Sequence, residues 1–149
     1  MDANFFANSD YPKAIQFLKT LDQPIDFQQG IDARIFTSEH GEALNEVKIH
    51  KQIRTAWDNP KDDLTKQFEL MTQYIPKGKI MVYVLIGYWS TPKEDLMRVT
   101  KIKELGLDAY SMPFDKKSQY QRDFTRWVNG RVGCSWEYYN PRKEQTVIV

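Results

Sequence analysis

The sequence predicts an α/β fold in which repeated βα units build a parallel sheet. The first observation is a regular alternation of strand-like and helix-like segments, with strands that begin near Pro24, Gln52, Lys79 and Leu107 at a nearly constant interval. The second is the length of the connections, since parallel strands need long and usually helical crossovers. The third is the apolar run 80–86, which is typical of a strand covered on both faces.

The four expected strands are rich in β-branched and aromatic residues and are bounded by turn-forming or polar residues. They are PIDFQQ, QIRTAW, KIMVYVLIGY and LDAYSMPF. In the third segment, the apolar run 80–86 is followed by the letters GYW and then by Ser90 or Thr91 before Pro92. This order predicts a short aromatic turn and a new helix. The last four letters, TVIV, predict an edge strand or a frayed end.

Helices are expected between and around these strands, at residues 11–21, 38–47, 61–75, 92–105 and 118–128. Their apolar residues recur at steps of three and four positions, as in Leu64, Phe68, Met71 and Ile75. Gly106 directly after the fourth helical segment fits a helix C-cap before the next strand. The middle of the chain therefore contains three successive βαβ units.

Length and glycine content bear on the choice between a barrel and a doubly wound sheet. A complete eight-unit barrel needs about 250 residues, whereas this chain has 149. Neither G-x-G-x-x-G nor G-x-x-x-x-G-K-[ST] occurs, although such turns are typical of doubly wound nucleotide folds. The sequence predicts a partial, half TIM-like barrel in a single domain 1–149. The βα repeats span about 24–115, and a carboxyl-terminal helix with an aromatic tail spans 116–149.

Composition argues against several classes of partner. The chain has 21 Lys and Arg against 20 Asp and Glu, a net charge of +1, so no bulk field favours nucleic acid or an anionic membrane. No run approaches the ~20 apolar residues that a membrane-spanning helix needs, so we expect a soluble chain with no membrane partner. Cys134 is the only cysteine, which excludes an intrachain disulfide and favours the cytoplasm; we expect it to be a packing residue.

Polar and aromatic residues gather at the predicted carboxyl ends of the strands, where parallel α/β folds bind ligands. These residues are Gln28, Gln29, Asp32, Arg34, Asp58, Asn59, Gly87, Tyr88, Trp89 and Asp115. Amides, carboxylates and an arginine beside aromatic rings suit a polar small molecule with a flat ring, such as a nucleoside. Two structural alternatives stay open: Asp58-Asn59-Pro60 as a helix cap only, and Tyr88 and Trp89 as a roof over the sheet.

Arg54 lies inside the second expected strand, where a buried cation needs a partner. That partner is either an anionic ligand or a carboxylate on the neighbouring strand, Asp26 or Asp32. The two histidines, His40 and His50, have no further ligand at a familiar metal spacing, so we expect both at the surface.

Five stretches together resemble the radical S-adenosylmethionine (radical SAM) family. They are DFQQGIDARIFT (26–37), IRTAWDNP (53–60), YVLIGYWSTPKEDLMRVTKIKELG (83–106), MPFD (112–115) and RWVN (126–129). In order and spacing they are similar to the later half of that family's partial (β/α)6 barrel, over almost the whole chain. The resemblance implies a barrel mouth that holds a [4Fe-4S] cluster and S-adenosylmethionine, whose reductive cleavage gives a 5′-deoxyadenosyl radical.

The resemblance also implies positions for S-adenosylmethionine. Gln29, Asp32 and Arg34 would lie near its ribose and methionine part, and Arg54 and Asp58 would end the next strand. It also implies that Ile86, Gly87 and Tyr88 lie beside the adenine. Gly87 has no Cβ, so its backbone can approach a flat ring closely.

The chain departs from the family in its cysteines. The family holds its cluster with a C-x3-C-x2-C loop early in the barrel, and one cysteine cannot supply three thiolates. We therefore expect a split half or fragment of a radical SAM enzyme, inactive unless another chain supplies the cluster. The alternative is a noncatalytic α/β module that binds a nucleotide-like ligand or a protein through its open sheet edge. Open edges predict a homo-oligomer or a separate chain that carries the cluster half.

Overall fold

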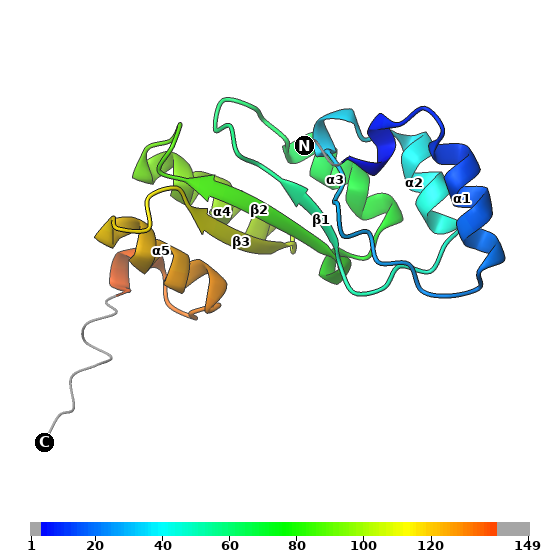
Figure 1. Ribbon diagram of the computed structural model, residues 1–149. Coiled ribbons are helices and arrows are strands. Elements are labelled where there is room, and N and C mark those ends of the chain that lie inside the picture. Colours follow the sequence, from blue (N-terminus) through cyan, green and yellow to red (C-terminus); the bar gives the residue numbers. More distant parts are fainter. Residues whose placement is uncertain (1–3, 140–149) are drawn as a thin grey trace, which may run out of the picture.

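Three parallel strands form one open sheet in the computed structural model, which describes residues 4–139 (Figure 1). They are β1 (Ile53–Ala56), β2 (Ile80–Ile86) and β3 (Asp108–Pro113), in the spatial order β1-β2-β3. Ile53 pairs with Ile80 in one ladder, and Met81 pairs with Asp108 in the other. The prediction of an α/β fold with a parallel sheet of βα units is confirmed.

Five α-helices accompany the sheet: α1 (Tyr11–Thr20), α2 (Ser38–Asn45), α3 (Thr65–Tyr74), α4 (Pro92–Glu104) and α5 (Gln119–Asn129). Short 3₁₀ turns are η1 (Phe5–Ala7), η2 (Ala33–Ile35), η3 (Lys77–Lys79) and η4 (Trp136–Tyr138). Thr91 is the N-cap of α4, and its capping box with Glu94 confirms the predicted helix start. None of the described helices is long and apolar enough to cross a membrane.

The helix expected from residue 61 begins only at Thr65. The indole nitrogen of Trp57 donates to the backbone oxygens of Asn59 (3.1 Å) and Asp62 (2.8 Å), which fixes residues 59–62 as a loop. Two local hydrogen bonds from a side chain have therefore overridden a helical pattern.

The first expected strand, from Pro24, is wrong. Its only ladder contact is an isolated parallel bridge between Ile25 and Ile49. Gly30, with φ of +79°, turns the chain before Ile31 donates its backbone N–H to the Arg54 oxygen at 2.8 Å. The segment thus runs beside β1 without forming a strand. The expected strand at TVIV lies outside the described residues.

The two faces of the sheet differ. Ile53, Val82 and Val84 are fully buried on one face, in the same core as Phe68 and Met71 of α3. Helix α4 contacts β2 and β3 on this face and lies behind the strands in Figure 1. We call the other side the open face, whose residues are half-buried or exposed: Arg54, Ala56, Met81, Tyr83, Leu85, Tyr110 and Met112. The prediction that 80–86 is covered on both faces is therefore wrong, because only every second residue of β2 is fully buried.

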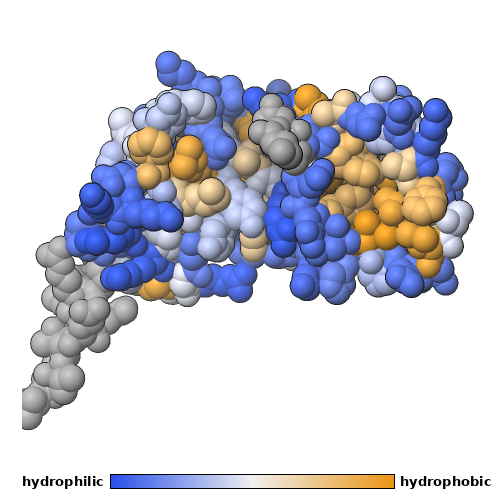
Figure 2. Space-filling model, viewed as in Figure 1, coloured by the Kyte–Doolittle hydropathy of each residue, from blue (hydrophilic) through white to orange (hydrophobic). Residues whose placement is uncertain are grey.

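Sequential strand order with helices on one face is the arrangement of a barrel segment, since a doubly wound sheet has helices on both faces. In the view of Figure 2, apolar surface lies over the β2–α4 turn region and over the α1–α2 region, with a polar band between them. Phe17 and Leu21 at α1 are 63% and 43% exposed.

Both edges of the sheet are partly occupied. Ile31 pairs with the free edge of β1, as described above. At the edge of β3, the side-chain amide of Asn129 accepts from the Ser111 backbone N–H (2.7 Å) and donates to the Ser111 oxygen (3.0 Å). A helix side chain thus satisfies the groups that a neighbouring strand would otherwise pair with.

The predicted environments of His40 and Cys134 need correction. His40 is half-buried: its ring stacks on Phe6 at 4.2 Å, its Nδ1 accepts from the Thr37 backbone N–H, and burial lowers its pKa. His50 is exposed as predicted. Cys134 is exposed and does not pack in the core. Its contact with the fold is made by its backbone oxygen, which accepts a hydrogen bond from the Trp127 indole at 2.8 Å.

Candidate ligand pocket at the carboxyl end of the sheet

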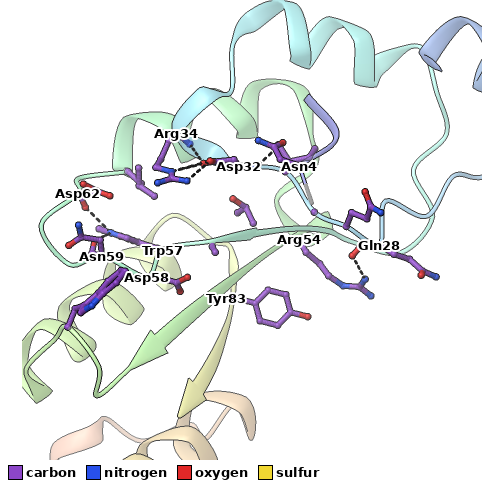
Figure 3. A pocket seen from close by; sticks show the side chains of 17 residues that line it. Asn4, Gln28, Asp32, Arg34, Arg54, Trp57, Asp58, Asn59, Asp62 and Tyr83 are labelled. Atoms are coloured by element: carbon purple, nitrogen blue, oxygen red, sulfur yellow. Dashed lines mark hydrogen bonds and ion pairs between the residues drawn. The ribbon is translucent and has the colours of Figure 1, made fainter. Parts of the chain in front are cut away.

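An open pocket of about 700 Å³ lies where β1 ends and the 28–34 loop passes beside it (Figure 3). It is lined by Asn4, Gln28, Gln29, Gly30, Ile31, Asp32, Arg34, Arg54, Thr55, Ala56, Trp57, Asp58, Asn59, Asp62, Leu64, Tyr83 and Trp89. Five of the eight residues predicted to bind a cofactor are among them: Gln29, Asp32, Arg34, Arg54 and Asp58. The pocket therefore runs along β1 and past its carboxyl end, and it gathers residues from two of the predicted strand regions.

The 28–34 loop is shaped by close backbone contact with β1. A Cβ on Gly30 would lie 2.9 Å from the Arg54 backbone oxygen, so this position needs glycine for space as well as for its positive φ. Asp32 accepts from the backbone N–H of Arg34 and forms an ion pair of 2.6 Å with its guanidinium. The hydrogen bond from Arg34 lowers the pKa of Asp32, so this carboxylate is ionised at neutral pH.

Arg54 lies on the open face and is half-buried, not buried as the sequence suggested. Neither Asp26 nor Asp32 is its partner. Its Nη1 donates to the backbone oxygen of Gln28 at 3.4 Å, a long contact to a neutral acceptor that is drawn in Figure 3. No carboxylate of the described residues pairs with this guanidinium, so it can still bind an anion.

Asp58 bridges the ends of two strands. Its Oδ1 accepts from the Leu85 backbone N–H at 3.0 Å, beyond the last pair of the β1–β2 ladder. Because α3 begins at Thr65, the alternative that residues 58–60 only cap a helix is wrong. The second carboxylate oxygen of Asp58 accepts no hydrogen bond from the described residues and is available to a ligand.

The other three predicted residues do not line the pocket. Ile86 is completely buried in the core. Gly87 has φ of +77°, and the side-chain amide of Gln121 occupies the space where its Cβ would lie. Tyr88 packs against Phe114, with ring centroids 4.5 Å apart.

Tyr83, Asp62 and Asn4 contribute to the pocket but were missed as site residues, and Trp89 was noted only at the strand end. Alternation along β2 could have placed Tyr83 opposite Val82 and Val84, on the open face. Asn4 could not have been found from spacing, since its side chain reaches the Asp32 backbone N–H (3.3 Å) across 28 positions of sequence.

A buried ionic network lies behind the pocket and was missed entirely. Arg98 on α4 has no exposed surface; it donates to the backbone oxygens of Trp57 (2.6 Å), Asp58 (2.9 Å) and Leu85 (3.0 Å). It also pairs with Asp95 at 2.7 Å. The ends of β1 and β2 are therefore tied to α4. Burial lowers the pKa of Arg98, while Asp95 acts in the opposite direction.

The same network reaches the β2–α4 turn and α5. Asp95 accepts from the Ser90 hydroxyl through Oδ1 and from the Tyr120 hydroxyl through Oδ2, the latter at 2.9 Å. Burial raises the pKa of Tyr120 well above its usual range, and the Asp95 carboxylate raises it further. The only sequence signal is an Asp and an Arg three positions apart among apolar helix residues, which also occurs on exposed helix faces.

The residues of this chain do not fit an iron–sulfur cluster. Cys134 is the single cysteine. In the described part of the chain, no group of three or more His, Cys, Asp or Glu side chains could hold a metal ion. What the pocket offers is recognition: two guanidinium groups, carboxylate acceptors, amides and three aromatic side chains. Comparison with known protein families, curated proteins and solved structures found no match to this chain.

Proposed function

We propose that this chain is the S-adenosylmethionine-binding half of a split or truncated radical SAM barrel. The observation that carries the proposal is that Gln29, Asp32, Arg34, Arg54 and Asp58 line one pocket, although the resemblance assigned them from two separate stretches. The one-sided arrangement of helices and the sequential strand order support the same proposal, because both are features of a barrel segment.

The pocket offers candidate partners for several groups of S-adenosylmethionine. The carboxylate of S-adenosylmethionine would pair with Arg54, whose present acceptor is a distant backbone oxygen. The ribose hydroxyls would donate to Asp62, and the unpaired oxygen of Asp58 would accept a hydrogen bond from the base. The Asp32–Arg34 pair would hold the 28–34 loop in place beside the ligand.

The cluster that the family uses is not part of this half. A lone, exposed thiol cannot supply the three thiolates that the cluster needs, so the chain by itself is expected not to cleave S-adenosylmethionine. We propose that a second chain supplies the cluster, in a reducing compartment such as the cytoplasm.

The edge beside residues 24–31 is the better place for that second half to dock. Asn129 already occupies the β3 edge at Ser111. At the other end of the sheet, the Phe5 backbone N–H donates to the Gly30 oxygen at 3.5 Å, a long contact that an added strand would replace while it continues the order of the sheet. A partner chain or a second copy would add strands by pairing with this backbone.

Titration calorimetry with S-adenosylmethionine tests the binding site. We expect Arg54→Met and Asp58→Asn each to weaken binding about tenfold, the effect of losing one charged contact of about 1.4 kcal/mol. Asp58→Asn keeps the acceptor for Leu85, so the sheet remains intact. Lys93→Met, which changes an exposed charge outside the pocket, is the matched control. A wild-type chain that does not bind the ligand would exclude the proposal.

Anaerobic reconstitution tests the statement about the cluster. After incubation with iron, sulfide and dithionite, the chain alone should show no cluster absorbance and should form no 5′-deoxyadenosine from S-adenosylmethionine. A cluster spectrum with product formation would contradict the assignment of the cluster to another chain.

The single cysteine favours a second candidate function, a noncatalytic module that binds a nucleotide-like ligand. Adenosine distinguishes the two candidates because it lacks the methionine carboxylate. The radical SAM half should bind S-adenosylmethionine clearly more tightly than adenosine, and Arg54→Met should abolish the difference. Equal affinities in the wild type would favour the noncatalytic module.

A further inference from the structure

We propose that the flat ring of the ligand stacks on Trp89, and that the adjoining Gly87–Tyr88 pair instead serves to support this indole. The inference rests on the proposed function only in the choice of S-adenosylmethionine as ligand. It assigns a specificity-determining residue to a position for which the family resemblance implied none.

The space next to Gly87 is already filled by protein. The Gln121 side chain from α5 is buried there, and its Oε1 accepts from the Asp115 backbone N–H at 2.8 Å. A ring brought against Gly87 on that side would displace this amide and leave the Asp115 N–H without its acceptor. The absence of a Cβ at Gly87 is therefore explained by Gln121.

Tyr88 is engaged on the side away from the pocket. Its ring lies 4.5 Å from that of Phe114 and 4.9 Å from that of Trp89, so the three rings form a continuous row. Of these three, only Trp89 lines the pocket. Tyr88 thus supports the indole, and Trp89, which lines the pocket and is 59% exposed as a residue, is available to a ligand.

The turn that carries Trp89 is fixed on both sides of it. Before it, the Gly87 backbone N–H donates to the Ser90 hydroxyl at 3.4 Å, and Ser90 in turn donates to the buried Asp95. After it, Thr91 begins α4 with a complete capping box. A large ring held in this way loses little entropy when a second ring stacks on it.

The pocket residues around Trp89 indicate a purine as the ring. Asn59 uses its side-chain oxygen to accept from the Lys61 backbone N–H, and its amide nitrogen has no acceptor among the described residues. The unpaired oxygen of Asp58 is the complementary acceptor for an exocyclic amine. Every base can stack on an aromatic ring, but only some carry both a hydrogen-bond donor and an acceptor. Adenine carries both, and so matches one protein acceptor and one protein donor beside an aromatic face.

The experiment compares Trp89→Ala and Trp89→Phe with Tyr88→Ala, a matched change in the adjoining exposed ring. Calorimetry uses three probes: S-adenosylmethionine, adenosine and methionine. Trp89→Ala should weaken the first two by roughly 5- to 100-fold, the range that stacking on an aromatic ring gives, and Trp89→Phe by less. Tyr88→Ala should change both by less than about threefold, and methionine affinity should be the same in all variants.

Two results would overturn the inference: unchanged adenosine binding in Trp89→Ala, or an equal or larger loss in Tyr88→Ala. Circular dichroism and thermal unfolding confirm that each variant is folded, which is expected because both side chains are at least half exposed. If S-adenosylmethionine binds but Trp89→Ala has no effect, the inference fails and the proposed function stands. If adenosine binds through Trp89 with no preference for S-adenosylmethionine, the proposed function fails and the inference stands. If the wild type binds neither, both fail.

Discussion

Arg98 on α4 and Arg54 on β1 lie in opposite environments. Arg98 has no exposed surface and makes four hydrogen bonds, three of them to backbone oxygens of residues that end β1 and β2. Arg54 is half-buried and has one long bond to a backbone oxygen. The Arg98 guanidinium therefore stabilises the fold, whereas the Arg54 guanidinium remains available to a ligand. The two roles cannot be told apart from the residue type, since both residues are arginines.

Removal of the buried charge should have the largest effect. Arg98→Met keeps the apolar stem but leaves Asp95 buried without its cation, so we expect a loss of about 3–5 kcal/mol in the free energy of unfolding. Chemical denaturation measures it, with Lys93→Met on the same helix as a control that should change little. A loss below about 1 kcal/mol would mean that the Arg98 network is not what fixes the strand ends.

Gly87→Ala should be next. The positive φ costs about 1–2 kcal/mol for an L residue, and the clash with Gln121 adds about 1–3 kcal/mol, so we expect about 2–5 kcal/mol in total. Gly78→Ala is the control, since nothing lies near its Cβ position. Adding Gln121→Ala to Gly87→Ala should remove the steric part; an unchanged loss would show that Gln121 does not define this turn.

Tyr120→Phe should cost about 1–3 kcal/mol at neutral pH, because Asp95 loses a hydrogen bond to its charged oxygen. Since folding raises the pKa of Tyr120 above the unfolded value of about 10, its contribution is complete below pH 10 and is lost as the pH rises further. The wild type should therefore lose more stability between pH 9 and 11 than the Phe variant does, as followed by urea denaturation. Tyr138→Phe, at an exposed ring, should keep the wild-type slope.

Arg54→Met should have the smallest effect on stability, within about 0.5 kcal/mol, because this guanidinium forms no ion pair within the described chain. The same variant should weaken S-adenosylmethionine binding. Thermal unfolding and calorimetry on one sample test both halves of the comparison. A large stability loss in Arg54→Met would place Arg54 with Arg98 as a residue of the fold.

Local signals were sufficient for much of the fold. The apolar run of β2 predicted a strand, and Thr91 with Pro92 predicted the start of α4, because a cap needs only neighbours in sequence. The segment from Pro24 has strand-like residues as well, yet it forms only one bridge. This segment does not form a strand for two reasons. The positive φ of Gly30 turns the chain locally, and the backbone of Ile31 is held by the Arg54 oxygen, which is distant in sequence.

Sequence alone determined the alternation of helix and strand, the net charge of +1 and the single thiol that cannot hold a cluster. It also determined which strand ends carry polar residues, since parallel strands bring those ends to one side. Tertiary structure alone decided that Arg98 is buried while Arg54 is available, and that Gln121 fills the space beside Gly87. The physical reason is that burial and hydrogen-bond partners depend on residues distant in sequence, whereas capping and periodicity depend on near neighbours.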